Sequence, residues 1–150
     1  MKTYIDSSAL IPIYLPEAFS ARAQREVRAA RQVPFTLVHG LEVRNTFHLL
    51  CGRGHISTTQ LRAVLSWLDD DMASHRLAQV PIDFTRLFER AEQLSAAHTS
   101  RLLCRSLDIL HVACALLLGC SRFVTADDRQ LALAEVVGMT AVDIKRTRRP

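Results

Sequence analysis

Four acidic residues stand where an apolar run of the sequence stops or is interrupted. They are Asp6 after Tyr4-Ile5, Glu42 within Leu41-Glu42-Val43, Asp108 within Leu107-Asp108-Ile109, and Asp127 after Phe123-Val124-Thr125-Ala126. Ionised carboxylates are costly in apolar surroundings and are rarely buried without a partner. Four of them in such positions predict oxygen ligands that converge on a hard cation. The pattern therefore indicates a metal-dependent enzyme.

Electrostatic repulsion favours a bound cation if these acids converge, because without one some pKa values would rise or the acids would move apart. Two carboxylates about 5 Å apart repel by roughly 3 kcal/mol at an effective dielectric constant near 20. A divalent ion removes this conflict, and Mg²⁺ characteristically binds through few carboxylates, several waters and a substrate phosphate. Such a site, with one ion or two, can activate a water and stabilise the leaving oxygen in phosphodiester cleavage.

Each acid also has a plainer interpretation. Asp6 and Asp127 stand where helix caps are expected, and Asp108 falls in the first turn of a predicted helix, where the helix dipole favours an anion. Glu42 fits a solvated helix face, although its neighbours are mostly apolar. The residue types alone leave these alternatives open.

Several polar residues are placed to support the four acids. Ser8 and Thr125 offer hydroxyls beside Asp6 and Asp127, and Asn45 lies one helical turn beyond Glu42. Asp128 competes with Asp127 for the same role.

Other polar residues have structural interpretations. His39 and His111 are interpreted as buried structural histidines, with His111 also placed to hydrogen-bond toward Asp108. The acidic run 69–71 is interpreted as a solvated helix segment.

Short predicted strands alternate with helices along the chain. Strands are predicted at 2–5, 33–36, 77–82, 122–125 and 140–143. One helix is predicted to begin near residue 8, and others to span 17–31, 37–51, 58–74, 83–97, 107–118 and 127–137. Ser8, Ser57 or Thr58, Asp83, Ser106 and Asp127 are the expected helix caps. The pattern predicts an α/β fold, a three-layer α/β/α sandwich with a short, mainly parallel central sheet. Ligands gather at the carboxyl ends of strands in such sheets, where Asp6 and Asp127 lie.

Composition is that of an ordinary globular protein. The chain has 150 residues, 49% apolar and 23% charged, which predicts one domain over 1–150. No apolar run approaches the roughly 18 residues of a membrane span, and Asp6 interrupts the apolar stretch that a signal peptide requires. The four cysteines lack a paired spacing and are expected to be reduced. A cytoplasmic protein is therefore the default expectation.

Basic residues are unevenly distributed within the formal net charge of +4. A basic tail occupies about 145–150, and arginines recur every third residue from Arg22 to Arg31. These are either solvated residues or a footprint for a polyanion such as RNA.

The ordered motifs resemble the PIN-domain family, and within it the VapC-type ribonuclease toxins of toxin–antitoxin pairs. The segments that carry the resemblance are Tyr4-Ile5-Asp6-Ser7-Ser8-Ala9-Leu10, Leu41-Glu42-Val43-Arg44-Asn45, Asp108-Ile109-Leu110-His111-Val112-Ala113 and Phe123-Val124-Thr125-Ala126-Asp127. The likeness spans about residues 2 to 144.

The resemblance implies a Mg²⁺ site, with Mn²⁺ as an alternative, and endonucleolytic cleavage of RNA. It assigns Asp6, Glu42, Asp108 and Asp127 to the metal site and catalysis, with Ser8, Asn45 and Thr125 in support and Asp128 as a second acid beside Asp127. A homodimer and a VapB-like antitoxin are its implied partners. Alternative functions are a metal-dependent DNA nuclease, a receiver-like module that accepts phosphate at Asp83, and an inactive interaction module.

Overall fold

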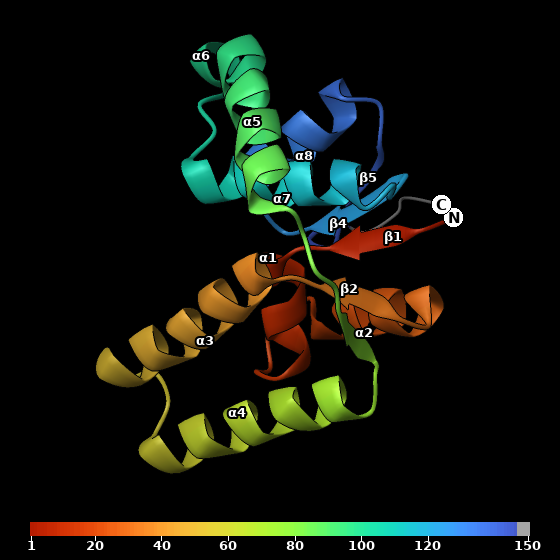
Figure 1. Ribbon diagram of the computed structural model, residues 1–150. Helices are drawn as coiled ribbons and strands as arrows, with labels where there is room; N and C mark the ends of the chain where they lie inside the picture. The colour runs from red at the N-terminus through yellow and green to blue at the C-terminus, as the bar shows by residue number, and fades with distance from the viewer. Residues whose placement is uncertain (147–150) are drawn as a thin grey trace.

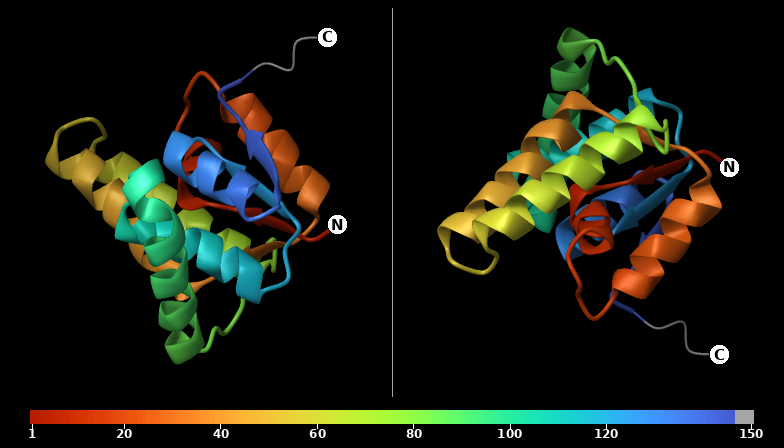
Figure 2. Two further views of the ribbon diagram at one scale, coloured as in Figure 1. Left: turned by 90° about the horizontal axis from the view of Figure 1, so that it is seen from above. Right: turned by 90° about the horizontal axis from the view of Figure 1, so that it is seen from below.

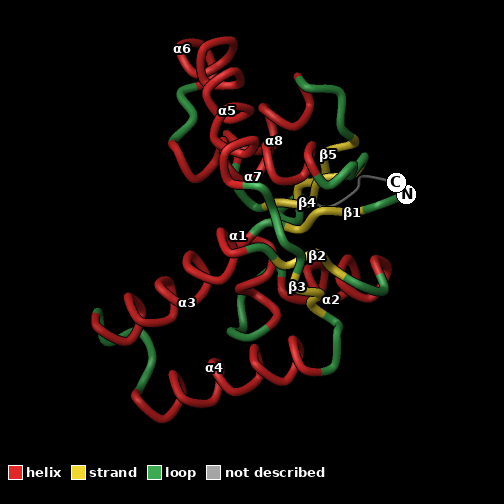
Figure 3. Tube along the Cα trace, viewed as in Figure 1, coloured by secondary structure: helices red, strands yellow, loops and turns green. Residues whose placement is uncertain are grey.

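The strands of the computed structural model, which describes residues 1–146, are short and parallel. They are β1 (Thr3–Ile5), β2 (Val33–Phe35), β3 (Leu77–Gln79), β4 (Arg122–Thr125) and β5 (Thr140–Asp143) (Figure 3). β4 pairs with both β1 and β5, and β2 pairs with β3, always in parallel register. Residues 147–150, which hold most of the predicted basic tail, lie outside the described part.

The sheet is divided between β1 and β2, where sequence analysis predicted one central sheet. Pro34 explains the division. The Val33 N–H donates to Arg76 O on the β3 side (2.9 Å), so position 34 faces β1, where proline has no N–H to donate. The side chain of His39 spans the gap instead, with Nε2 2.9 Å from Ile5 O.

Helices cover both faces of the strands, as the predicted sandwich requires (Figures 1 and 2). They are α1 (Ser7–Leu10), α2 (Ser20–Ala30), α3 (Leu37–Gly52), α4 (Thr58–Ala73), α5 (Phe84–Leu94), α6 (Ser100–Leu102), α7 (Ser106–Leu117) and α8 (Asp128–Val136). The α/β sandwich predicted from the sequence is confirmed. No helix within residues 1–146 is long and apolar enough to cross a membrane.

Two hydrophobic cores form because successive strand side chains point to opposite faces. Tyr4 and Phe123 pack with α5, α7 and α8, whereas Ile5 and Val124 pack with α1 to α4. All four side chains are fully buried, and burying a large apolar side chain contributes about 1.5–3 kcal/mol. The cores hold β1 and β4 rigidly side by side, and this packing fixes the residues just beyond the carboxyl ends of the two strands.

Some local predictions were wrong. Asp6, not Ser8, caps α1, and its Oδ1 accepts from the Ala9 N–H (3.1 Å). The cap position of α7 is Arg105 rather than Ser106. β3 ends at Gln79 instead of continuing to Ile82.

Two further expectations concern surface charge and cysteines. Asp71 is not simply solvated, because it accepts a hydrogen bond from Tyr14 Oη (2.7 Å). On α2, Arg22 donates to Ile144 O (3.0 Å), whereas Arg25 is exposed.

All four cysteines are free thiols.

Candidate active site

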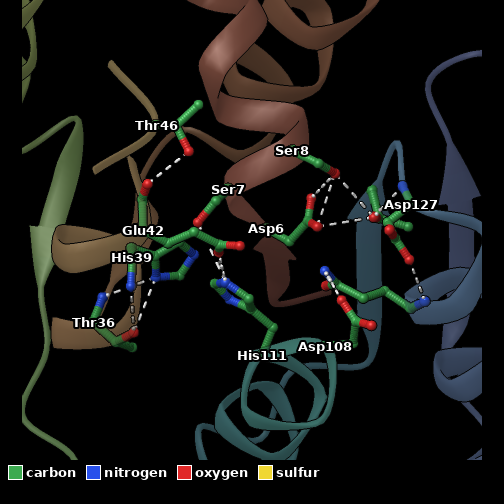
Figure 4. A network of polar contacts seen from close by, with 12 residues as sticks. Asp6, Ser7, Ser8, Thr36, His39, Glu42, Thr46, Asp108, His111 and Asp127 are labelled. Carbon is green, nitrogen blue, oxygen red and sulfur yellow. Dashed lines mark hydrogen bonds and ion pairs between the residues drawn. The ribbon is translucent and has the colours of Figure 1, made fainter. Parts of the chain in front are cut away.

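The Asp6 carboxylate is fully buried directly after β1. The Asp6 N–H donates to Val124 O (3.0 Å), so the pairing of β1 with β4 extends to this residue and fixes its position. Ser8 Oγ lies 2.9 Å from each carboxylate oxygen, and Thr125 Oγ1 donates to Oδ2 at 2.9 Å. These hydroxyls hold the carboxylate at the strand ends. Figure 4 shows Ser8 beside Asp6.

Burial raises the pKa of the Asp6 carboxyl to about 6, although the charge of His111 and the Ser8 and Thr125 hydrogen bonds act in the opposite direction. An ionised carboxylate in such a place needs a positive partner, and a bound cation supplies one.

A chain of hydroxyl and amide contacts connects Asp6 to the fourth acid. Ser8 Oγ accepts from the Ala126 N–H (2.8 Å), and Thr125 Oγ1 accepts from the Asp127 N–H (2.9 Å). Asp127 caps α8 through Oδ1, which accepts from the backbone N–H of Arg129 (2.9 Å) and of Gln130 (3.0 Å). The second oxygen of Asp127, Oδ2, takes no part in the cap.

Asp108 occupies the first turn of α7 and is almost completely buried. Its Oδ2 accepts from the Arg105 backbone N–H (2.9 Å), and its Oδ1 lies 3.4 Å from Gln130 Nε2. The Arg105 guanidinium contacts both Asp108 and Asp127 through their Oδ2 atoms. One cationic side chain therefore already bridges two of the predicted ligands.

The Glu42 carboxylate, which is partly exposed, contacts the buried ring of His111. Burial acts to raise the pKa of Glu42, but the hydrogen bond and the charge of His111 outweigh it and lower the pKa. The ring of His111 is fixed by Tyr4 Oη, 2.9 Å from Nδ1, and by Ser7 Oγ, 3.3 Å from Nε2. Glu42 is held in a defined orientation.

The two histidines have different surroundings. His39 is buried, accepts from the Thr36 N–H at Nδ1 (3.0 Å) and donates from Nε2 to Ile5 O, which defines a neutral ring. Burial, together with the charge of His111, lowers the pKa of His39 well below its usual range. The predicted contact of His111 with Asp108 is replaced by the contact with Glu42.

Asp128 and Asn45 are placed outside this network. The Asp128 side chain is 75% exposed and pairs with Lys145 Nζ at 2.9 Å, a contact that lowers the pKa of this acid. Asn45 is exposed on α3. Thr46, one helical turn beyond Glu42, donates a hydrogen bond from its Oγ1 to the Glu42 backbone carbonyl (2.8 Å). The geometry thus favours Asp127 over Asp128.

The donor chemistry of the site suits a hard divalent ion. Its candidate ligands are all oxygens, and the buried Oε1 of Gln130 beside Asp108 lacks a hydrogen-bond partner among the described residues. Over residues 1–146, however, no three His, Cys, Asp or Glu side chains stand close enough together to hold a metal ion. Binding through three protein ligands therefore requires side-chain rotation, and Arg105 must release Asp108 and Asp127.

Comparison with known families identifies the fold. The PIN domain family matches residues 3–136 of the sequence. The chain belongs to the PIN-domain family. PIN domains are generally metal-dependent nucleases, which agrees with a carboxylate-rich network at the strand ends.

Solved structures support the same PIN fold. The crystal structure of FitAcB from Neisseria gonorrhoeae is similar over 97% of this chain and 99% of that chain, with a TM-score of 0.65 and 10% identity. That of PAE2754 from Pyrobaculum aerophilum is similar over 95% and 90% of the two chains, with a TM-score of 0.60 and 16% identity. No protein of curated function matches at a significant level.

Sequence reasoning missed three residues of this polar network. Arg105 and Gln130 contact Asp108, and Ser7 contacts His111. The spacing of Arg105, three residues before Asp108 across a predicted helix start, was a usable signal. The contact between Ser7 and His111 is purely tertiary and had none.

Proposed function

We propose that this PIN domain is a Mg²⁺-dependent endoribonuclease, with Mn²⁺ as an alternative ion, and that it is the cytoplasmic toxin of a VapC-type toxin–antitoxin pair. The observation that carries the proposal is the arrangement of Asp6, Asp108 and Asp127 around the ends of β1 and β4, connected by hydroxyls and by one arginine. Glu42 approaches from α3 beside His111. RNA, a VapB-like antitoxin and a second copy of the chain are the proposed partners.

Each side chain has a distinct role in the proposed mechanism. Asp6, Asp108 and Asp127 would hold the ion, and Glu42 would complete the site or orient an attacking water. Ser8 and Thr125 keep the Asp6 carboxylate turned to the site through their hydrogen bonds. A bound Mg²⁺ would supply Lewis-acid charge for attack on the phosphodiester and for the leaving oxygen.

Removal of the metal is the direct test. We expect purified protein with Mg²⁺ to cut end-labelled RNA, and excess EDTA to abolish cutting until Mg²⁺ or Mn²⁺ is restored. A DNA of the same sequence, incubated in parallel, decides between the ribonuclease and the DNA-nuclease alternative. Undiminished cutting in EDTA would contradict the metal-dependent mechanism.

The toxin proposal has a separate test. Induced expression of the chain should arrest bacterial growth, and co-expression of a small antitoxin-like protein from the neighbouring reading frame should restore it. The matched control is expression of the Asp108→Asn variant, which should not arrest growth. Arrest by both forms would contradict a toxin that acts through this site.

The contact between His111 and Glu42 predicts a difference between two substitutions. Gln places an amide near the position of Nε2 and keeps a donor for Glu42, whereas the shorter Asn does not. We expect His111→Asn to lower RNA cleavage by about 10–100-fold, the usual loss when the partner of a ligand is removed. His111→Gln should retain most activity.

Initial rates of RNA cleavage, with thermal unfolding to confirm folding, measure this difference. His48→Asn, an exposed residue on α3, is the control and should behave as wild type. Equal losses of RNA cleavage in His111→Asn and His111→Gln would mean that His111 acts through packing and not through its hydrogen bond to Glu42.

A further inference from the structure

Arg105 occupies an unusual place for a cation. Its Nε lies 3.4 Å from Asp108 Oδ2 and its Nη2 lies 3.5 Å from Asp127 Oδ2. Asp108 lies in the first turn of α7 and Asp127 caps α8, so the guanidinium sits at two helix N-termini. Helix N-termini carry partial positive charge and disfavour a cation. The two carboxylates are therefore what hold it there.

The local backbone directs the guanidinium to this position. Arg105 is in extended conformation at the start of α7, with φ −89° and ψ 164°, and its N–H donates to the Asp108 carboxylate. The residue is thus fixed at its backbone beside one ligand, and its long side chain reaches the second. Its positive charge also acts on Glu42, so it influences three of the four acids.

The bridge is loose enough to open. Both contacts are longer than the 2.7–2.9 Å of strong charge-assisted hydrogen bonds, and the Arg105 side chain is 67% exposed while Asp108 is 5% exposed. Solvent around the exposed guanidinium screens both contacts and weakens them. The Asp108 carboxylate is buried and the Asp127 side chain is 20% exposed, whereas the guanidinium can leave toward solvent.

We infer that Arg105 is an internal counter-ion, which neutralises Asp108 and Asp127 in the metal-free protein and competes with the divalent ion for them. This inference rests on the proposed function, because it takes both acids as metal ligands. Displaced by the ion, the guanidinium stays at the rim of the site, where it can bind an RNA phosphate. Arg105 is thus a positioning residue that exchanges one anionic partner for another.

Substitution of Arg105 by Gln should raise the affinity for Mg²⁺ but lower the thermal stability of the metal-free protein. Without the competing guanidinium, we expect Mg²⁺ to bind about two- to fivefold more tightly, the range that an exposed ion pair controls. Without a cation of its own, the metal-free variant should unfold at a lower temperature in EDTA and regain more stability with Mg²⁺ than wild type does. The KM for RNA should rise, because a phosphate contact is lost.

Isothermal titration of metal-stripped full-length protein with Mg²⁺ measures the first effect, and thermal unfolding in EDTA measures the second. Arg129→Gln is the matched control. Arg129 is exposed in the first turn of α8, and its charge lies in the same region, but its backbone N–H rather than its guanidinium contacts Asp127. This control should bind Mg²⁺ more weakly than Arg105→Gln does.

The outcomes separate the inference from the function beneath it. Wild-type protein that neither binds Mg²⁺ nor cuts RNA would overturn the proposed function. Wild-type protein that does both, with Mg²⁺ affinity unchanged or reduced in Arg105→Gln, would overturn the counter-ion role alone. An equal gain in Arg129→Gln would also overturn it, because long-range charge would then explain the effect.

Discussion

Replacement of Asp108 by Asn is expected to lower Mg²⁺-dependent RNA cleavage by about two to three orders of magnitude, as is typical when a preorganised electrostatic group is removed from an active site. Asn has nearly the same shape and keeps an oxygen that can accept from the Arg105 N–H, which now lies 2.9 Å from the carboxylate. The fold should therefore survive. The variant lacks only the negative charge that the proposed ion requires.

Rates of RNA cleavage over a Mg²⁺ titration measure this effect, and saturating Mg²⁺ should not restore the wild-type rate. Asp70→Asn is the matched control, because Asp70 is an exposed acid on α4 outside the network at the strand ends. It should cut RNA at the wild-type rate. Undiminished RNA cleavage by a folded Asp108→Asn variant would show that Asp108 is not a catalytic residue.

The sequence predicted the position of the strands well because their signals are local. Tyr4-Ile5 and Phe123-Val124 are apolar pairs followed by polar residues, and alternate residues of each pair enter opposite cores. The division of the sheet had only a partial signal in the sequence. Pro34 was visible in the sequence, but which edge of β2 it faced depended on pairing with β3.

The proximity of two of the acids was predictable from the sequence, but the partners of the acids were not. Asp6 and Asp127 follow strands that pair in parallel, so their proximity follows from topology. The contact of His111 with Glu42 joins residues 69 positions apart on α7 and α3, and no periodicity encodes it. Asp127 and Asp128 were likewise indistinguishable in the sequence, until the pairing of Asp128 with Lys145 placed it outside the network.

A trade between stability and function is expected at Asp6. The pKa of this carboxyl is about 6 in the folded protein, against about 3.9 in an unfolded chain. The folded state therefore binds more protons than the unfolded state between these values. The stability that the protonated carboxyl contributes is present below about pH 4 and is lost as pH rises through about 6. At pH 7.5 the loss amounts to up to about 3 kcal/mol.

Asp6→Asn removes this titration while it removes a proposed ligand. Relative to wild type in EDTA, we expect the variant to gain up to about 3 kcal/mol in free energy of unfolding between pH 4 and pH 7.5, yet to lose RNA cleavage as Asp108→Asn does. Urea unfolding at several pH values measures the first effect. Any constant cost of altered hydrogen bonds to Ser8 and Thr125 cancels in the pH dependence. A difference between variant and wild type that does not change with pH would mean that the Asp6 carboxylate is already neutralised in the metal-free protein. Addition of Mg²⁺ at pH 7.5 should stabilise the wild type more than the variant, because the buried charge that destabilises the metal-free fold is the charge that the ion binds.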